Sequence, residues 1–484
     1  MAFFLPCLSL LVLAILSSYV TQLINDARRR LPPGPRPLPI IGNILHISSK
    51  LPHRALARLA GRHGAPLMAV RLGASLFVVA SSPSAAREIL QTHNASLSGR
   101  SPADAWSAGG HGANSVFVLQ PGGRKWRVLR RLGTAHVLSR RRSERPPRGV
   151  VSVRRAAFAA TARLLWRAMF SDELGEAALQ GLYDFVREAM ALVMTPNVSD
   201  FFPCVAAADL QGVRRRMAPL VARIYRLMDG QIECRMRARG SDGRDAPRSN
   251  DLLDAMLDVS EEQGDGSGVS IVNRDVIRAF CTDLFIAGLD TSSNTIEWAM
   301  AELLQNPQTM RTLQEELRTV LGSKAQVEDS DIDKLPYLRA VIKETFRLHS
   351  VVPLMCYRAE VTVQVQGYTI PQGSNVLVNA WAIHHDADVW TEPHKFLPER
   401  FLDKGIEFFG RNFEFIPFGS GRHICLGLPL ANRMLHTMLG SLLHQFEWNL
   451  TEHDRASGVD MTEKFGLVLS MATPLHATVK RKQH

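Results

Sequence analysis

The chain of 484 residues lacks the marks of several specialised protein classes. Its six cysteines are scattered singly, without a Cys-x-x-Cys pair, which argues against a disulfide scaffold and fits a reducing compartment. No internal repeat is evident, and no charged side chain precedes Asp26. Hydrophobic residues make up 46% of the chain, which is ample for the core of one large domain or of two or three ordinary ones.

The balance of charge is basic, with a formal net charge of +11 and an isoelectric point of about 9.6. A basic chain attracts nucleic acid, an anionic membrane or an acidic protein partner. The charge alone does not choose among these three classes of partner.

The first segment, residues 3–24, is almost entirely apolar, and Arg28, Arg29 and Arg30 follow it at once. A run of about 20 apolar residues is long enough to span a bilayer as a helix. The basic cluster is expected to stay in the cytosol, with the N-terminus on the other side. A cleaved signal peptide is the competing interpretation, but such peptides carry their positive charge before the apolar run. The dense prolines that follow, within residues 25–39, favour a stiff arm or a plain surface linker.

Further along, residues 66–80 alternate like a pair of strands, and residues 82–92 are predicted to form a helix capped by Ser82. Residues 101–121 are expected to form a long loop, and residues 361–378 a small antiparallel sheet. The intervening stretches 156–193 and 210–239 show helical spacing of apolar residues.

One cysteine, Cys425, sits between glycines in the stretch 415–427 (FIPFGSGRHICLG), just ahead of a long apolar run. A helix N-terminus offers backbone N–H groups and a positive dipole, and both lower the pKa of a thiol. A thiolate held there is a good ligand for a soft or borderline metal, and the glycines let the backbone approach something flat and bulky. A lone cysteine can also be a small buried hydrophobic residue, so only the whole pattern of residues around Cys425 can distinguish a metal ligand from a core residue.

The segment 276–305 is predicted to form a long helix with unusual residues near its centre. Gly288 costs about 1 kcal/mol relative to Ala, a cost that a flat ligand or a bulky packing neighbour would offset. The hydroxyl of Thr291 can turn toward the carbonyl of Ala287 and open a polar notch. With the carboxylate of Asp290 beside it, such a notch can deliver protons.

Two further groups of residues are spaced for cooperation. Trp126 and Arg130 are four apart on a predicted helix, so both can reach one carboxylate of a ligand. Glu344 and Arg347 are three apart on the helix predicted over 336–348, and Arg400 could complete a buried ion network with them. Taken alone, each group also fits an ordinary solvated helix face.

These motifs occur in the order typical of one family, and the stretch around Cys425 resembles the haem-thiolate signature of the cytochromes P450. The resemblance covers the chain from the proline arm to about residue 470. It implies the mainly helical P450 fold with a minor antiparallel β-sheet. The implied domains are a transmembrane anchor at 3–24, a basic and proline-rich hinge at 25–39 and a catalytic domain at 40–484.

The resemblance also implies roles for individual residues, with Cys425 as the metal ligand and Thr291 and Asp290 as the catalytic pair. Haem is expected to be held by Trp126, Arg130, Arg358, Phe418, His423 and Gly427. The structural ion network would consist of Glu344, Arg347 and Arg400. The substrate pocket would be lined by Leu284, Ala287, Gly288, Val352, Leu354, Phe465 and Leu467.

The implied reaction is monooxygenation of a small lipophilic molecule, with haem b, O2 and electrons from NADPH through a membrane-bound reductase. The reductase's acidic surface would suit this basic chain, and no nucleic acid is expected. Residues 195–203 and 461–466 look like the plant geraniol 8-hydroxylase-like group, which oxidises monoterpenoids and diterpenoids. The expected location is the endoplasmic reticulum membrane, single-pass, with the catalytic domain facing the cytosol.

The sequence departs from the family pattern at three places. His423 stands where Arg is more usual, and His384 and His385 stand where Gly and Arg are more usual. No further ligands flank the histidine pair at the spacing of a metal site. The stretch 138–153 has no room for a helix expected there. Two alternatives therefore stay open: a haem-thiolate isomerase or dehydratase, and an inactive, degenerate member of the family.

Overall fold

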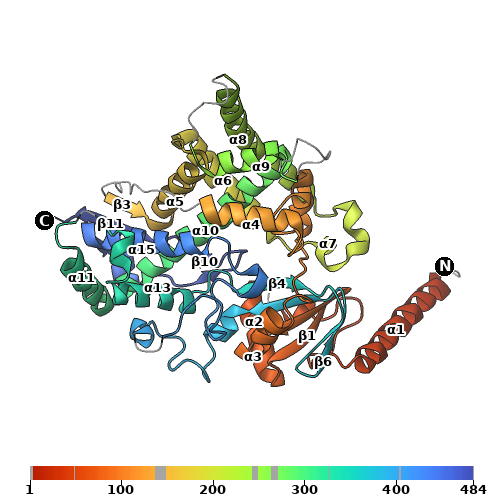
Figure 1. Cartoon of the computed structure of the whole chain (residues 1–484). Coiled ribbons are helices and arrows are strands. Elements are labelled where there is room, and N and C mark those ends of the chain that lie inside the picture. The colour runs from red at the N-terminus through yellow and green to blue at the C-terminus, as the bar shows by residue number, and fades with distance from the viewer. Residues whose placement is uncertain are drawn as a thin grey trace.

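The computed structural model describes residues 4–47, 50–136, 149–241, 249–262, 271–324, 326–402 and 405–482. Helices dominate one side of the molecule, and the largest sheet lies with a few short helices on the other (Figure 1). The prediction of a mainly helical fold with a minor sheet component is confirmed.

Most of the described chain is helical. The α-helices are α1 (Phe4–Arg28), α2 (Pro52–His63), α3 (Pro83–Arg87), α4 (Arg124–His136), α5 (Val153–Phe170), α6 (Glu176–Val193), α7 (Val198–Phe201), α8 (Val213–Ser241), α9 (Leu252–Glu262), α10 (Arg274–Gln305), α11 (Pro307–Leu321), α12 (Asp329–Ile332), α13 (Pro336–Leu348), α14 (Ala380–His384), α15 (Leu428–Gln445) and α16 (Glu452–Ser457). Shorter turns of 3-10 helix are η1 (Ile44–His46), η3 (Asp104–Ala113), η4 (Pro203–Ala208), η6 (Pro398–Phe401) and η7 (Gly421–His423), and η2 (Glu88–Thr92) is a π-turn.

The strands are short and form separate small sheets. They are β1 (Leu67–Leu72), β2 (Ser75–Ala80), β3 (Gly149–Ser152), β4 (Leu354–Arg358), β5 (Val363–Val365), β6 (Tyr368–Ile370), β7 (Asn375–Asn379), β8 (Phe446–Leu450), β9 (Glu463–Lys464), β10 (Ser470–Met471) and β11 (His476–Arg481). The largest sheet has the order β1-β2-β7-β4, and its β2–β7 pair is parallel. The sheet predicted over 361–378 is therefore divided: β5 and β6 pair with each other, and β7 joins the mixed sheet.

Local sequence signals explain several of these elements. The β1–β2 hairpin turns at Gly73, whose φ of 60° suits glycine, and pairs Leu72 with Ser75. The side chain of Ser82 accepts a hydrogen bond from the backbone N–H of Ala85 at 3.2 Å, so the predicted cap of α3 is confirmed. Pro336 occupies the first turn of α13, where the missing N–H has no intrahelical role.

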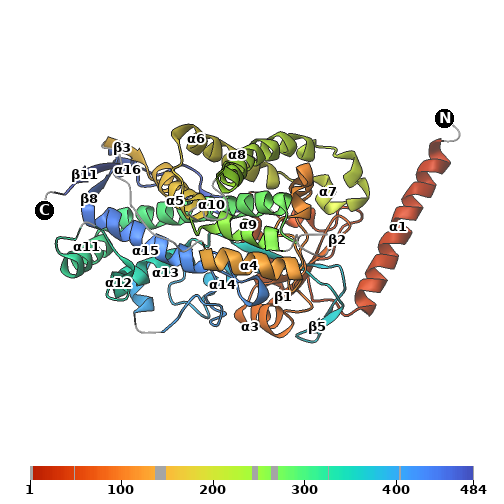
Figure 2. The ribbon, with the colours of Figure 1, turned by 45° about the horizontal axis from the view of Figure 1, so that its top comes forward.

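The helix α10 passes through the middle of the helical part of the molecule (Figure 2). It contributes to two hydrophobic clusters, one shared with α5, α6, α8 and α9 and the other with α11, α13 and α15. Because it is enclosed from several directions, it has no single apolar stripe, and most of its residues are buried.

The N-terminal helix α1 projects from the rest of the protein in both views (Figures 1 and 2). At its end, Asp26 pairs with Arg71 of β1 at 2.6 Å. The proline segment then runs against β1, where the N–H of Ala69 donates to the carbonyl of Pro33 at 3.0 Å. A side chain at Gly34 would collide with the carbonyl oxygen of Ala69, so glycine is needed for this close approach.

The predicted transmembrane anchor at 3–24 falls almost entirely within α1. Within the described part of the chain, no helix is both long enough and apolar enough to cross a membrane.

Two other expectations fall in the region between α3 and α5. The expected loop 101–121 contains the 3-10 segment η3, which is broken at Ala108, Gly109 and Gly110. Residues 137–148, where an expected helix has no room in the sequence, lie outside the described residues. The strand β3 follows them and leads into α5 without any helix between.

Candidate functional site

The loop before α15 holds Cys425 in a defined backbone geometry. The N–H of Cys425 donates to the carbonyl of Phe418 at 2.9 Å, which closes the loop on itself. Gly419 and Gly421 have φ of 70° and 69°, values that glycine adopts at little cost. A Cβ on Gly421 would lie 2.1 Å from the carbonyl oxygen of Leu90, so the loop also needs glycine there to pack against η2.

The thiol of Cys425 lies just ahead of the first turn of α15, and its side chain is accessible. Burial raises the pKa of this thiol, while the backbone N–H groups of Gly427 and Leu428 and the guanidinium of Arg130 act in the opposite direction. The sulfur lies at the helix start that the sequence predicts, and its role as a metal ligand stays a prediction.

The predicted pair on α4 lies against the cysteine loop. The guanidinium of Arg130 donates to the carbonyl of Ile424 at 2.9 Å and lies 5.0 Å from the ring centre of Trp126. Desolvation lowers the pKa of Arg130, and the neighbouring Cys425 opposes that shift. Gly133 on the same helix allows close contact with Leu426.

A second basic group comes from a residue that the sequence analysis missed. Arg100 donates to the carbonyl of Cys356 and lies 5.0 Å from the ring of Tyr357. The ring of His423 lies 5.7 Å from that of Tyr357, and its Nε2 donates to the carbonyl of Ser98 at 2.7 Å. Burial, the first cause, and nearby arginines lower the pKa of His423 to about 4, so the ring is neutral near pH 7. The Nε of Arg100 is buried without a partner among the described residues.

Arg358, which the sequence analysis assigned to the haem, is the last residue of β4 and follows Tyr357. Its side chain is exposed and lies toward Gly373. The haem contact expected of Arg358 stays a prediction, and Arg100 is a further basic residue beside His423. The sequence contains little indication of a role for Arg100, because this residue stands alone in a loop. Its neighbours in the structure come from the pairing of Gly99 with β4.

The centre of α10 presents one partly accessible face, although the helix is otherwise enclosed. Leu284, Ala287, Gly288 and Thr291 are half-buried, at the spacing of one helical face. The hydroxyl of Thr291 donates to the carbonyl of Ala287 at 2.6 Å, as predicted for the notch. Ala287 and Thr291 both lie on this face, so the polar notch is partly accessible.

The structure supplies a packing neighbour for Gly288. A Cβ at this position would lie 2.8 Å from a methyl group of Leu165 on α5. Contact between α10 and α5 is extensive, so the packing alternative accounts for the glycine, and its expected place in the substrate pocket stays a prediction. Thr291 and Asp290 carry the case for chemistry on this helix instead.

Asp290 faces a different environment from Thr291. Burial raises the pKa of its carboxyl, and the charge of Arg154 and a hydrogen bond from Asn294 at 2.9 Å oppose that shift. Arg154 also pairs with the buried Glu297 at 3.1 Å. Asp290 therefore belongs to a chain of charged groups that runs between α5 and α10.

The predicted ion network is present and buried. Arg347 makes two contacts of 2.8 Å with the carboxylate of Glu344, and Arg400 contacts the same carboxylate at 3.1 Å. Phe346, which lies between Glu344 and Arg347 in the sequence of α13, packs edge-on against Phe418, with ring centres 5.1 Å apart. The helix that carries the network therefore touches the cysteine loop directly.

These features fit a flat prosthetic group that bears carboxylates. An accessible thiol lies at one helix start, and α10 carries a face of half-buried residues. The charge of Arg130 acts on the thiol, and the charges of Arg130 and Arg100 act on the nearby His423. The Nε of Arg100 has no partner among the described residues. Iron protoporphyrin matches both the soft ligand and the two arginines.

Comparisons with known proteins agree with this geometry. The family model described as Cytochrome P450 matches residues 32–148 and 140–476. The chain belongs to the cytochrome P450 family. Its two matched segments overlap at residues 140–148, within the stretch where the sequence analysis expected a helix and found no room for it.

Curated relatives place the chain more closely within the P450 family. It is 41% identical to Geraniol 8-hydroxylase of Swertia mussotii, with 93% of each chain covered. It is 40% identical to Geraniol 8-hydroxylase of Catharanthus roseus, with 94% of each chain covered. It is 41% identical to Cytochrome P450 76C1 of Arabidopsis thaliana, with 95% of this chain and 93% of the relative covered. The chain is a plant-type P450 monooxygenase of the geraniol 8-hydroxylase-like group.

The residues predicted to line the substrate pocket lie in different surroundings. Phe465 stacks on His53 of α2 at 5.5 Å, Val352 and Leu354 are half-buried, and Leu467 is exposed. Their role toward a substrate stays a prediction. A small space of about 10 Å³ lies beside α10, lined by Ala105, Trp106, His111, Phe185, Ala189, Met217, Val221, Thr282 and Ile286. The sequence analysis named none of these residues, because they come from α6, α8, α10 and the loop segment η3.

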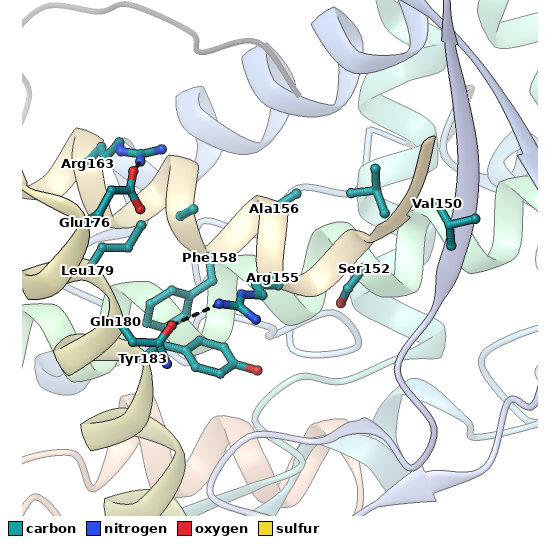
Figure 3. Close-up of a pocket in the computed structure, with 12 residues that line it drawn as sticks. Val150, Ser152, Arg155, Ala156, Phe158, Arg163, Glu176, Leu179, Gln180 and Tyr183 are labelled. Atoms are coloured by element: carbon teal, nitrogen blue, oxygen red, sulfur yellow. Dashed lines mark hydrogen bonds and ion pairs between the residues drawn. The ribbon is translucent and has the colours of Figure 1, made fainter. Parts of the chain in front are cut away.

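A larger pocket of about 350 Å³ lies between β3, α5 and α6 (Figure 3). Arg155 donates to Gln180 across it, and Arg163 pairs with Glu176 at one end. No predicted site residue lines this pocket. It is therefore separate from the P450 site.

A buried polar network joins the loop segment η3 to α10. Both oxygens of the Asp283 carboxylate accept hydrogen bonds, from the ring Nε2 of His111 at 3.0 Å, the hydroxyl of Ser115 at 3.1 Å and the N–H of Val116 at 2.7 Å. The other nitrogen of His111 lies 2.7 Å from the hydroxyl of Tyr225 on α8. A neutral His111 satisfies both contacts by donating to Asp283 and accepting from Tyr225.

This network also reaches the wall of the small space beside α10. The indole N–H of Trp106 donates to the hydroxyl of Ser115 at 3.0 Å, and that hydroxyl donates to Asp283. Trp106 lines the space, so Asp283 fixes the wall indirectly. The loop can bend at Gly109 and Gly110, where φ is positive, and the network holds it against α10.

We expect Asp283→Asn to lower the free energy of unfolding by about 1–3 kcal/mol, because an amide N–H₂ would face a buried donor. The measurement is urea unfolding of the two purified proteins. Asp275→Asn on the same helix is the matched control, since Asp275 is exposed and pairs with Arg278 at the surface. Equal stability of wild type and Asp283→Asn would contradict the role of the network.

Proposed function

We propose that this P450 hydroxylates a terpenoid, using O2 and electrons that come from NADPH through a reductase. The observation that carries the proposal is the accessible thiol of Cys425 at the start of α15, beside the basic group. Haem bound to that thiol supplies the iron chemistry that activates O2. The relatives named geraniol 8-hydroxylase and, in Isodon rubescens, ferruginol synthase support a terpenoid substrate.

The protein's own residues supply the remaining parts of the reaction. Arg130, His423 and Arg100 present N–H groups on one side of the thiol and can orient the carboxylates of haem b. The notch at Ala287 and Thr291 places a hydroxyl on the accessible face of α10, where it can hold a water and pass a proton. The notch favours monooxygenation over the isomerase alternative, which needs no proton delivery to oxygen.

The exposed surface near the cysteine loop supports an acidic electron donor. Arg124, Arg127 and Arg131 of α4 are exposed, and Arg422 of the loop lies against the turn at Gly122. A basic surface at this position would attract an acidic reductase and place it near Cys425.

We expect Cys425→Ala to abolish the thiolate-type difference spectrum of the reduced carbon monoxide complex. The control is Cys356→Ala, which removes an accessible thiol on β4 and should leave the spectrum unchanged. A retained thiolate-type spectrum in Cys425→Ala would refute the assignment of the ligand.

Thr291→Ala should leave haem binding and the substrate-induced spectral shift intact, because alanine is the better helix former. Product formed per NADPH should fall about 10-fold or more, with a matching rise in hydrogen peroxide, because general acid catalysis is lost. Thr295→Ala is the control, since Thr295 makes the same type of bond one turn later, to the carbonyl of Thr291 at 2.8 Å, but is buried. Equal coupling in Thr291→Ala and wild type would remove Thr291 from the mechanism.

We further propose that the protein works on the cytosolic face of the endoplasmic reticulum membrane. Supporting this, α1 carries exposed apolar side chains away from the body of the protein, among them Leu10, Leu13, Leu16 and Val20. The basic cluster at its end would suit an anionic lipid surface.

Removal of residues 1–24 should shift the protein from the microsomal pellet to the supernatant in high salt. The control is Arg28→Gln in the full-length chain, which should stay in the pellet if apolar contacts dominate. Attachment of a glycan at the half-buried Asn94 or Asn449, each the first residue of a sequon, in a eukaryotic host would place the catalytic part on the wrong side and contradict the proposal.

A further inference from the structure

His384, one of the two histidines that depart from the usual family pattern, is fully engaged by the protein around it. It ends α14 and is buried. Its Nε2 accepts a hydrogen bond from the backbone N–H of Ile416 at 3.0 Å, and its Nδ1 lies 2.7 Å from the hydroxyl of Ser350. Both ring nitrogens are therefore used, and neither is available to a metal ion.

The contacts define the protonation state of the ring. The N–H of Ile416 can only donate, so Nε2 carries the lone pair and Nδ1 carries the proton that goes to Ser350. Burial above all, and then the charges of His385 and Arg347, hold the pKa of His384 well below its usual range. The ring is thus a neutral acceptor throughout the physiological pH range.

Ile416 begins the turn from which the cysteine loop continues. The N–H of Gly419 donates to the carbonyl of Ile416 at 3.0 Å, and the N–H of Cys425 donates to the carbonyl of Phe418 at 2.9 Å. The side chain of Ile416 is fully buried. The turn at residues 416–419 is called the corner of the loop. Its position sets the position of the Phe418 carbonyl, which accepts the hydrogen bond from the N–H of Cys425.

The backbone of His384 is tied to the ion network as well. Its carbonyl accepts a hydrogen bond from Nη1 of Arg347 at 2.9 Å, and Arg347 is held by Glu344. One residue therefore connects the buried ion pair of α13, through α14, to the first corner of the cysteine loop. A glycine at this position would keep the carbonyl contact but would remove the ring that accepts from Ile416.

We propose that His384 is a positioning residue for the Cys425 loop, acting through the hydrogen bond from Ile416 to its Nε2. Without the ring, the N–H of Ile416 loses its acceptor in a buried place, which costs free energy and frees the corner to move. This inference rests on the proposed role of Cys425 as a thiolate ligand, but the hydrogen bond itself can be tested independently.

The experiment compares His384→Leu, His384→Gln and wild type by two readouts. The first is amide hydrogen exchange over residues 412–419 in the full chain, which reports the loop without reference to catalysis. The second is the fraction of bound haem that gives the thiolate-type spectrum with carbon monoxide. In His384→Leu we expect roughly 10-fold faster exchange, which corresponds to about 1.4 kcal/mol, and a smaller thiolate fraction. His384→Gln should restore both, because its amide oxygen can accept from Ile416.

The matched control is His436→Leu. His436 is also buried, but it bonds to Asn432 within α15 at 2.6 Å and has no contact with Ile416 among the described residues. Unchanged exchange and spectrum in His384→Leu would overturn the proposal. Equal changes in His384→Leu and His436→Leu, or failure of His384→Gln to restore them, would show general destabilisation and overturn it too. Faster exchange in His384→Leu, together with a wild-type protein that shows no thiolate spectrum, would keep the positioning role and refute only the ligand assignment.

Discussion

A buried negative charge must be matched by positive charge and hydrogen bonds, and Glu344 is the place where this requirement organises the P450 site. Its carboxylate accepts from Arg347, from Arg400 and from the N–H of Leu397 at 2.9 Å. The two arginines in turn donate to backbone carbonyls of the segment 384–395. Removing one partner of such a set is costly, because the remaining charges stay buried. The segment is therefore held in one conformation, and the cysteine loop packs on it.

The contact between the loop segment η3 and α10 is organised by the same physics with different residues. Asp283 is buried on α10, and the groups that satisfy it come from a loop that includes two adjacent glycines with positive φ. The backbone of that loop has little regular structure of its own, so its conformation depends on a carboxylate from another element. Two parts of the fold are thus fixed by buried carboxylates, each satisfied by groups from a distant segment of the chain.

The sequence was most informative where the signal is local. The start of α13 at Pro336 and the helix cap at Ser82 follow from properties of single residues, and both are found where expected. The spacing of Trp126 and Arg130 correctly predicts that they share a face. The Glu344 network was predictable only because family resemblance supplied the distant Arg400, which no spacing rule would select.

Other parts were out of reach because they depend on tertiary contacts. Arg100 becomes relevant only when Gly99 pairs with β4. Gly288 left two explanations open in the sequence, because the packing neighbour, Leu165, lies more than a hundred residues away in the chain. Asp283 and His111 gave no signal at all, since neither belongs to a recognisable spacing and their contact crosses two elements.

The sheet β3-β11-β8 has a consequence for how the protein is made. Its central strand, β11, comes from the last residues of the chain and pairs with β3 on one side and β8 on the other. During synthesis, β3 therefore has no β11 to pair with until more than three hundred further residues have been made. Contacts so distant in sequence form slowly, and an unpaired edge exposed during synthesis is a target for chaperones or aggregation. A truncation of only the final dozen residues would remove β11, the shared partner of β3 and β8. Such a truncation would therefore also destabilise the start of α5, which follows β3 directly.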